Sequence, residues 1–361
     1  FYFYIYAKTN DSDSLKYFTD GELRVFTNSF LKFGSNFVIA ISSLLIKTLK
    51  VNYFSLNLFF GSLGTLGLLF LGNLIQKKML RNNFFFYVLL IILFLPSLNF
   101  FTSSIGKDSL IFLFSSLLVW SLDDYNNSKI PLIILSIFLL ILTRLYIAVP
   151  VSIIIYFFFP LIIEKKFSKI FYTIYYLSFF ILFIMIVYFL KEILVQAGVM
   201  STIESLSENS LSLNLDYLFD RMNSQSQSLS SAKSNYKGLH DNYLFYYFQY
   251  IFGPFLFDSQ IGLKYLLTKI ETQFYLFMIL SVILFTAMSF NKKSLFFKNI
   301  MFLMIFFSIT IPLSLAISNY GISVRQRVLF YPFLIYILTS NIHYFLNEKK
   351  INFNIFKSNY N

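Results

Sequence analysis

Long runs of apolar residues, separated by short polar stretches, form the dominant pattern along this chain. A run of about 17–25 apolar residues is long enough to cross a bilayer as an α-helix. Such runs lie at about 55–75, 84–101, 130–148, 170–190, 272–290, 297–317 and 326–346. Shorter runs lie at about 109–122 and 150–163, and residues 1–7 look like the end of a truncated span. The pattern predicts an all-α, polytopic membrane protein with about ten transmembrane helices, built as a single membrane domain over residues 1–361.

The sidedness of these helices follows from the short basic loops between them. The loops are QKKMLR (76–81), EKKFSK (164–169), NKKSLFFK (291–298) and NEKK (347–350). Short loops that are rich in Lys and Arg and adjoin a span stay in the cytoplasm. All of these loops fall on one side without adding or deleting a helix, so we expect them to be cytoplasmic.

Two long segments, 8–54 and 191–270, then fall on the outer side. The second is too long for a structureless loop in a compact protein, and loops of this length are usually functional. The apolar stretch 37–54 carries Lys47 and Lys50 near its end. We therefore expect this stretch to form an interfacial or re-entrant helix on the outer face rather than a full span.

Composition supports the membrane assignment. Hydrophobic residues make up 57% of the chain, the mean hydropathy is +0.68, and 13% of the residues are charged, against about 25% in a soluble domain. The net charge of +12 comes largely from lysines in short loops, which argues against nucleic acid as a partner. The chain has no cysteine, which excludes disulfides, thiolate metal sites and a cysteine nucleophile. It begins FYFYIYAK without Met, so we expect its natural start to lie upstream.

Charged residues within or beside spans are costly and are therefore functional candidates. Arg144 lies near the outer end of its span, where it either reaches the interface by snorkelling or contacts a substrate or partner. Lys107 and Asp108 stand in the outer turn 101–108. They either form a local ion pair that caps the next helix or help to bind an anion at its N-terminus.

The outer turn 318–325 leads into the last span and carries Arg325, with Arg327 just beyond it. By the loop assignment these arginines face outward, so they are not part of the basic residues that mark the cytoplasmic loops. Arginine suits bidentate phosphate binding better than lysine does. Because one residue separates the two arginines, they point to different faces of a helix. We expect at least one of them to bind substrate, or else both to anchor the helix at lipid headgroups.

Further charges lie on the same side. Arg221 in the long outer segment adds a cation, while Asp11 and Asp13 in the first segment either form a solvated acidic loop or supply a base. His240 and His343 have no histidine or carboxylate at ligand spacing, so we expect no metal site. The chain has no P-loop, nucleophile elbow or dinucleotide fingerprint. We therefore expect no cofactor, and a reaction whose energy comes from the substrate or from a gradient.

Outward-facing cations and carboxylates without a nucleotide site suit sugar transfer from a polyprenyl diphosphate. The cations would neutralise the departing diphosphate, and a carboxylate would take the proton from the attacking hydroxyl.

Several short motifs add a resemblance. They are DSLKYF, LPSLNFFTSSIGKDSL, the stretch from Arg221 to Ser234-Asn-Tyr236, FGPFLF followed by IET, and NYG-x(3)-R-x-R-x(4)-P. Together with the intramembrane Arg144, they resemble bacterial surface-polysaccharide repeat-unit polymerases (Wzy-type, EpsG-like), within the lipid-linked-sugar membrane glycosyltransferases. The resemblance spans most of the chain.

The resemblance implies O-antigen, capsule or exopolysaccharide synthesis at the bacterial cytoplasmic (inner) membrane, by a metal-independent glycosyltransferase. It implies polyprenyl-diphosphate-linked glycans as substrates, with the lipid bilayer and other polysaccharide-assembly proteins as further partners. It assigns diphosphate binding to Arg144, Arg325 and Arg327.

The candidate site unites these residues. The candidate catalytic carboxylates are Asp13, Asp11 and Asp108, and the candidate diphosphate-binding cations are Arg325, Arg327, Arg144, Lys107 and Arg221. We expect Lys107, Arg144, Arg325 and Arg327 to surround one cavity. Two other functions compete with sugar transfer: a transporter or flippase for the same lipid-linked oligosaccharide, and a membrane acyltransferase. The single long outer segment argues against the two related halves of a flippase, and His343 lies at the cytoplasmic end, away from outer-face acyl transfer.

Overall fold

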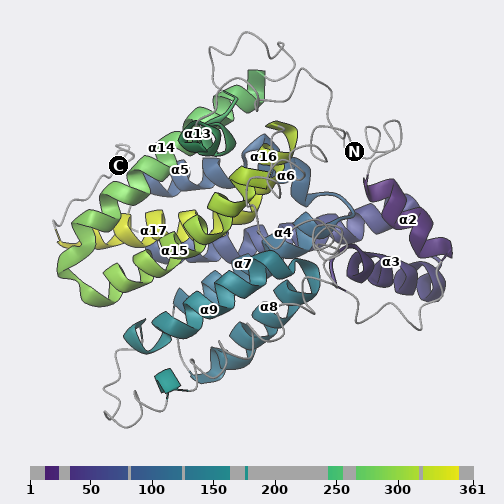
Figure 1. The fold of residues 1–361 in the computed structure, drawn as a ribbon, viewed down its shortest axis with the longest axis horizontal. Helices are drawn as coiled ribbons and strands as arrows, with labels where there is room; N and C mark the ends of the chain where they lie inside the picture. Colours follow the sequence, from purple (N-terminus) through teal and green to yellow (C-terminus); the bar gives the residue numbers. More distant parts are fainter. Residues whose placement is uncertain are drawn as a thin grey trace, which may run out of the picture.

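Helices form all of the regular secondary structure in the part of the chain that the structure describes (Figure 1). The computed structural model describes residues 13–23, 33–79, 83–123, 127–162, 175–177, 243–254, 266–316 and 320–348. The α-helices are α2 (Asp13–Leu23), α3 (Ser35–Leu49), α4 (Tyr53–Met79), α5 (Asn83–Leu93), α6 (Pro96–Thr102), α7 (Lys107–Asp123), α8 (Ile130–Thr143), α9 (Leu145–Ile162), α13 (Tyr243–Phe252), α14 (Leu266–Met288), α15 (Lys293–Ala316), α16 (Tyr320–Arg327) and α17 (Tyr331–Glu348). The short 3₁₀ helix η6 (Val328–Phe330) joins α16 to α17.

Within these residues, five helical stretches are long and apolar enough to cross a membrane. They are Tyr53–Met79, Leu145–Ile162, Leu266–Met288, Lys293–Ser314 and Tyr320–Asn347. A sixth results if Phe84–Leu93 and Pro96–Thr102, which are bent by 46° at their junction, count as one span. The all-α class and several candidate membrane spans are thereby confirmed for the described residues.

One end of the bundle, which we call the lysine end, is closed by a polar network around Lys78, Asp123 and Lys298. The Lys78 ammonium pairs with Asp123 at the end of α7 and donates to the Ser340 hydroxyl of α17 at 2.8 Å. Lys298 of α15 donates to the Asp123 carbonyl at 3.1 Å. His343 Nδ1 lies 2.7 Å from the Lys78 carbonyl. The ends of α4, α7 and α17 and the start of α15 therefore lie side by side.

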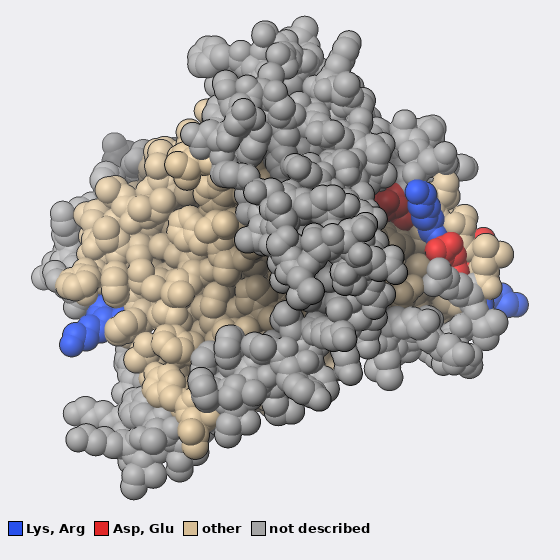
Figure 2. Space-filling view, viewed as in Figure 1, with Lys and Arg blue, Asp and Glu red and all other residues tan. Residues whose placement is uncertain are grey.

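The basic loops fit this arrangement. The described residues of three predicted loops lie at the lysine end and are mostly helical: 76–79 end α4, 293–298 begin α15, and 347–348 end α17. The loop at 164–169 lies outside the described residues. Figure 2 shows basic side chains at this end of the molecule, acidic and basic side chains at the opposite end, and mainly uncharged surface on the described part between them.

Helix α7 connects the two ends of the bundle. Its 17 residues at 1.5 Å each give a length of about 25 Å, close to the thickness of a bilayer's hydrocarbon core. Most of its side chains are buried, because α4, α8 and α17 pack around it. It begins at Lys107, so it places Lys107 and Asp108 at the end opposite Asp123.

Two glycines let other helices approach α4 closely. A Cβ on Gly64 would lie 2.3 Å from the Thr102 carbonyl oxygen, and one on Gly67 would lie 2.8 Å from a ring carbon of Phe112. Neither contact leaves room for a side chain, so glycine is required at both positions. This close approach fixes the end of α6 and the start of α7 against α4, and with them Lys107.

The short helices α2 and α3 pack on each other at the end of the bundle that holds Lys107 (Figure 1). Gly34 precedes α3 with a φ of 74°, a conformation that glycine adopts without strain. Its backbone N–H donates to the Leu142 carbonyl at 2.8 Å. This bond joins the start of α3 to the end of α8.

Several element boundaries differ from those predicted. The run 84–101 forms two helices because Pro96 starts a new helix, as is usual for proline at a first helical position. The boundary between the predicted spans 130–148 and 150–163 lies at Arg144, whose backbone is extended. Most of the predicted turn 318–325 is helical, since α16 begins at Tyr320.

The outer segments are described in part. The stretch 37–54 contains most of α3, which ends at Leu49, and the first two residues of α4. Helix α13 and the start of α14 lie within 191–270. The predicted span at 1–7, the one at 170–190 apart from the helical residues 175–177, and the rest of 191–270 lie outside the described residues.

Candidate functional site

Asp108 lies at the centre of a cluster of charged side chains opposite the lysine end. It stands in the first turn of α7, and its side chain is 4% exposed. Arg144 Nη2 donates to Asp108 Oδ1 at 3.0 Å, and Arg325 Nε donates to Asp108 Oδ2. The two guanidinium groups therefore flank one buried carboxylate. Neither position is near Asp108 in sequence, so tertiary structure alone brings them together.

Arg144 reaches Asp108 because the chain turns at this residue. Helix α8 ends at Thr143, the Arg144 backbone is extended, and α9 begins at Leu145 and packs against α8. Arg144 Nη1 also donates to the Tyr146 hydroxyl at 2.7 Å. Its side chain is 11% exposed. Arg144 thus points into the protein and not toward a lipid interface, as snorkelling would require.

Arg325 extends the cluster toward the surface. Its Nη1 donates to Asp13 Oδ2 at 2.9 Å, so one guanidinium bridges a carboxylate of α7 and one of α2. The Arg325 side chain is 29% exposed and that of Asp13 is 56% exposed. The cluster is therefore closed at Asp108 and open at Asp13.

Lys107 adds a third cation. Its ammonium lies against the start of α3, 3.8 Å from where a Cβ on Gly34 would stand. Burial, followed by the nearby Arg144, lowers the pKa of Lys107 to about 8. Among the described residues Asp108 forms its ion pairs with Arg144 and Arg325, and not with Lys107 as its position suggested. The cluster carries one net positive charge, because it contains three cations (Lys107, Arg144 and Arg325) and two carboxylates (Asp13 and Asp108).

Arg327 lies apart from this cluster. It is 4% exposed, and its guanidinium donates to the Tyr250 carbonyl at 2.9 and 3.2 Å, to the Gly253 carbonyl, and to Thr272 Oγ1 at 3.0 Å. These partners lie on α13, just beyond it, and on α14. Residues two positions apart on a helix point about 200° away from each other, so Arg325 and Arg327 face different neighbours. Arg327 holds α13 against the bundle.

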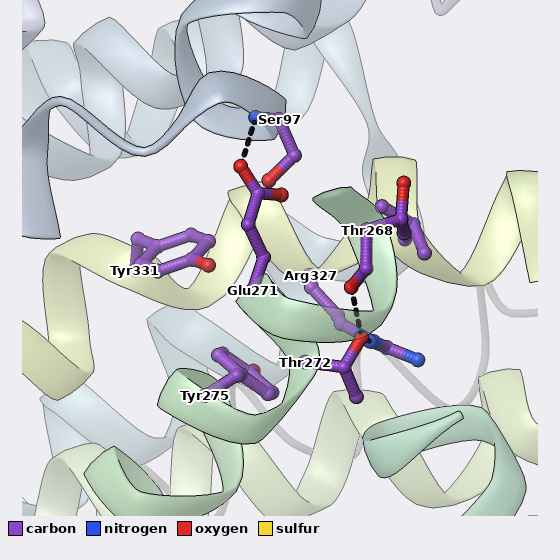
Figure 3. A pocket seen from close by; sticks show the side chains of 8 residues that line it. Ser97, Thr268, Glu271, Thr272, Tyr275, Arg327 and Tyr331 are labelled. Carbon is purple, nitrogen blue, oxygen red and sulfur yellow. Dashed lines mark hydrogen bonds between the residues drawn. The ribbon is translucent and has the colours of Figure 1, made fainter. Parts of the chain in front are cut away.

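A small cavity lies beside Arg327. It is lined by Ser97, Thr268, Glu271, Thr272, Tyr275, Val324, Arg327 and Tyr331. Figure 3 shows Glu271 and Arg327 entering it from neighbouring helices, with two tyrosine rings alongside. Glu271 Oε1 accepts the backbone N–H of Ser97 at 2.9 Å, at the start of α6. The cavity has room for about one water molecule, so it is a junction between helices and not a place for a sugar.

Five of the predicted site residues lie together, one lies apart, and two lie outside the described residues. Lys107, Asp108, Arg144, Arg325 and Asp13 lie together, and we call these five the Asp108 cluster. Asp11 and Arg221 lie outside the described residues. Within the described ranges, no group of three His, Asp or Glu side chains is arranged to hold a metal ion.

Two charged sites were missed by sequence reasoning. One is the Lys78–Asp123 pair at the lysine end, and the other is Glu271 beside Arg327. Each carboxylate stands at the end of an apolar run, which is the signal that could have singled them out. Their partners are distant in sequence, however, and no local pattern identifies them.

Comparison of the chain with protein-family models finds no match, and comparison with curated proteins and with solved structures also finds none. Function must therefore be inferred from the residues and their geometry.

Proposed function

We propose that this protein is a membrane glycosyltransferase that polymerises or transfers polyprenyl-diphosphate-linked oligosaccharide units at the outer face of the bacterial cytoplasmic membrane. The observation that carries the proposal is the Asp108 cluster, in which Arg144 and Arg325 come from separate helices to flank one carboxylate. Lys107 stands next to them. Cations gathered from several helices are what a site for a diphosphate needs.

Sidedness supports an outward-facing site. The loops at the lysine end are short and basic, which favours a cytoplasmic location. Helix α7 separates Asp108 from Asp123 at that end by about 22 Å along its axis. The Asp108 cluster then faces the outer side, where lipid-linked oligosaccharides are assembled into polymers. In this account the spans that are described form part of a bundle of about ten.

The chemistry divides between the cations and Asp13. The diphosphate is the leaving group, so the substrate carries its own energy, and the chain needs no nucleotide site. Arg144, Arg325 and Lys107 stabilise the negative charge that develops on the diphosphate as the bond to the sugar breaks. Asp13 is the candidate base, because its side chain is open and uses only Oδ2 toward Arg325 among the described residues.

Asp108 has a different role. Both of its oxygens accept from guanidinium groups and its side chain is buried, so it does not reach a substrate hydroxyl. It holds Arg144 and Arg325 in place and lowers the repulsion between them. We therefore assign it as a positioning residue.

Replacing both arginines tests the proposal. Cells carrying the Arg144→Gln, Arg325→Gln double variant at matched protein level should make little or no surface polymer, measured as polymer amount and length. A Lys292→Gln, Lys293→Gln double variant, which removes two exposed charges at the lysine end, is the matched control and should retain polymer. Full-length polymer from the arginine double variant would reject the proposal. Accumulation of untransported lipid-linked units on the cytoplasmic side would indicate a flippase instead.

A further inference from the structure

Arg325 is held by two carboxylates in very different surroundings. The Asp108 side chain is 4% exposed and is shared with Arg144, whereas the Asp13 side chain is 56% exposed. Among the described residues, Asp13 contacts the guanidinium only through Oδ2, at 2.9 Å from Arg325 Nη1. In the part of the chain that the structure describes, the open side of Arg325 therefore meets one carboxylate, that of Asp13, which solvent reaches.

Helix α2 does not depend on this contact for its position. The Ser14 hydroxyl lies 2.8 Å from the Tyr53 hydroxyl, and the Phe18 ring packs edge-on against the Tyr53 ring at 5.4 Å. At the far end of α2, Gly21 abuts α3 so closely that a Cβ would lie 3.2 Å from Ser42. Asp13 can thus leave Arg325 while α2 stays in place.

The charges favour an exchange of Asp13 for a phosphate. An exposed ion pair is a weak contact that changes an equilibrium constant by about fivefold at most. A guanidinium–phosphate contact can be bidentate and is roughly twice as strong as a neutral hydrogen bond. When Asp13 leaves Arg325, the cations Lys107, Arg144 and Arg325 face the incoming diphosphate, and Asp108 is the carboxylate that offsets them within the described part of the chain.

We propose that Asp13 occupies the place on Arg325 that a phosphate oxygen of the substrate takes, so that the bound diphosphate displaces Asp13 and releases it as the base. This inference rests on the proposed function. The released carboxylate accepts the proton of the acceptor hydroxyl while that oxygen bonds to the anomeric carbon. The bond from this carbon to the phosphate oxygen breaks, and polyprenyl diphosphate leaves with the electron pair. Asp13 is free for proton transfer only when a diphosphate is bound.

The test is the affinity for inorganic pyrophosphate of the purified full chain in zwitterionic nanodiscs at constant pH. In Asp13→Asn the internal competitor loses its charge, so the dissociation constant should fall by about fivefold. Glu22→Gln removes the same charge from an exposed site on the same helix and should match the wild type. Asp13→Glu, which keeps the charge, should also stay near the wild type, and Arg325→Gln should lose binding.

An unchanged or weaker affinity in Asp13→Asn, with Glu22→Gln at the wild-type value, would overturn the inference. Nanodiscs containing phosphatidylglycerol distinguish the source of the phosphate. If that lipid abolishes pyrophosphate binding in the wild type, the site is a headgroup anchor and the inference is wrong. The proposed function can fail separately. If Asp13→Asn binds pyrophosphate more tightly but the wild type transfers no sugar, the glycosyltransferase function is rejected and the displacement of Asp13 by diphosphate stands. Transfer by the wild type without that tightening would reject only the exchange.

Discussion

Asp108 and Asp123 lie at opposite ends of α7, and cations from other helices meet each carboxylate. Arg144 and Arg325 pair with Asp108, and Lys78 pairs with Asp123. The helix between them is mostly buried. Two polar clusters thus stand at the ends of one central helix, about 22 Å apart along its axis, a separation of the same order as the hydrocarbon core of a bilayer, about 30 Å.

Loss of the Asp108 charge should destabilise the protein strongly. Asp108→Asn leaves two guanidinium groups without their shared counter-charge, and breaking a buried pair costs about 3–5 kcal/mol. Asp13→Asn breaks an exposed pair and should cost under about 1 kcal/mol. Unfolding of purified protein by denaturing detergent measures both free energies. Equal costs for the two variants would show that Asp108 is not the anchor of the cluster.

The two polar ends should face opposite sides of the membrane. The chain has no cysteine, so single cysteines can be introduced at Glu22 on α2 and at Lys293 at the lysine end, both exposed positions. An impermeant thiol reagent should label Glu22→Cys in intact cells and Lys293→Cys only after the cells are opened. The reverse pattern would invert the assignment, and labelling of both in intact cells would contradict it.

Arg327 should matter for folding and not for transfer. Its guanidinium bonds to the Tyr250 and Gly253 carbonyls inside the protein, so Arg327→Met leaves buried acceptors unpaired at about 1–3 kcal/mol each. We expect lower protein levels and lower thermal stability, with unchanged polymer per molecule of folded protein. A variant that folds normally but makes no polymer would return Arg327 to the substrate site.

Lys107 should make substrate binding depend on pH. Lys107 lies at the first position of α7, outside the candidate spans, and burial beside Arg144 lowers its pKa to about 8. Its ammonium is therefore present at pH 7 and is lost as the pH rises through 8. Affinity for a short-chain polyprenyl diphosphate sugar should fall between about pH 7 and pH 9.5, with a midpoint above 8 because a bound anion favours the charged form.

The control for this dependence is Lys107→Met, which should bind more weakly at pH 7 and show a flat profile. Stability should change in the opposite direction. Because the folded protein releases this proton more readily than the unfolded chain, whose lysine titrates near 10.5, stability should rise between pH 8 and 10.5. A falling affinity that persists in Lys107→Met would assign the titration to another group.

The helical class could be predicted from the sequence because long apolar runs have few alternatives in a membrane. The boundary at Arg144 could not, because Val149 and Pro150 offer a more obvious break, yet Pro150 and Pro160 both lie inside α9. Helix α9 packs against α8 and α15, and tertiary packing of this kind routinely overrides a local propensity.

The sequence could predict which residues belong to the candidate site, but not which of them pair with each other. Costly charges at span ends singled out Arg144, Asp108 and Arg325, but pairing between them depends on how the helices pack. The same pattern gave Arg327 equal weight, since nothing in the local sequence distinguishes an arginine that faces a carboxylate from one that faces backbone carbonyls.

The most direct test of the proposed function is chain extension by the purified protein in nanodiscs supplied with a polyprenyl-diphosphate-linked oligosaccharide. Gel analysis of the released glycans should show products longer than the starting unit with the wild type. Arg325→Ala should lose about ten- to a hundredfold in activity, as expected for one or two charge-assisted bonds. Arg325→Lys should recover only part of that loss, because a lysine cannot form the guanidinium's paired contacts. Longer glycans at the wild-type rate from Arg325→Ala, or no extension by wild-type protein that binds the substrate, would contradict the account.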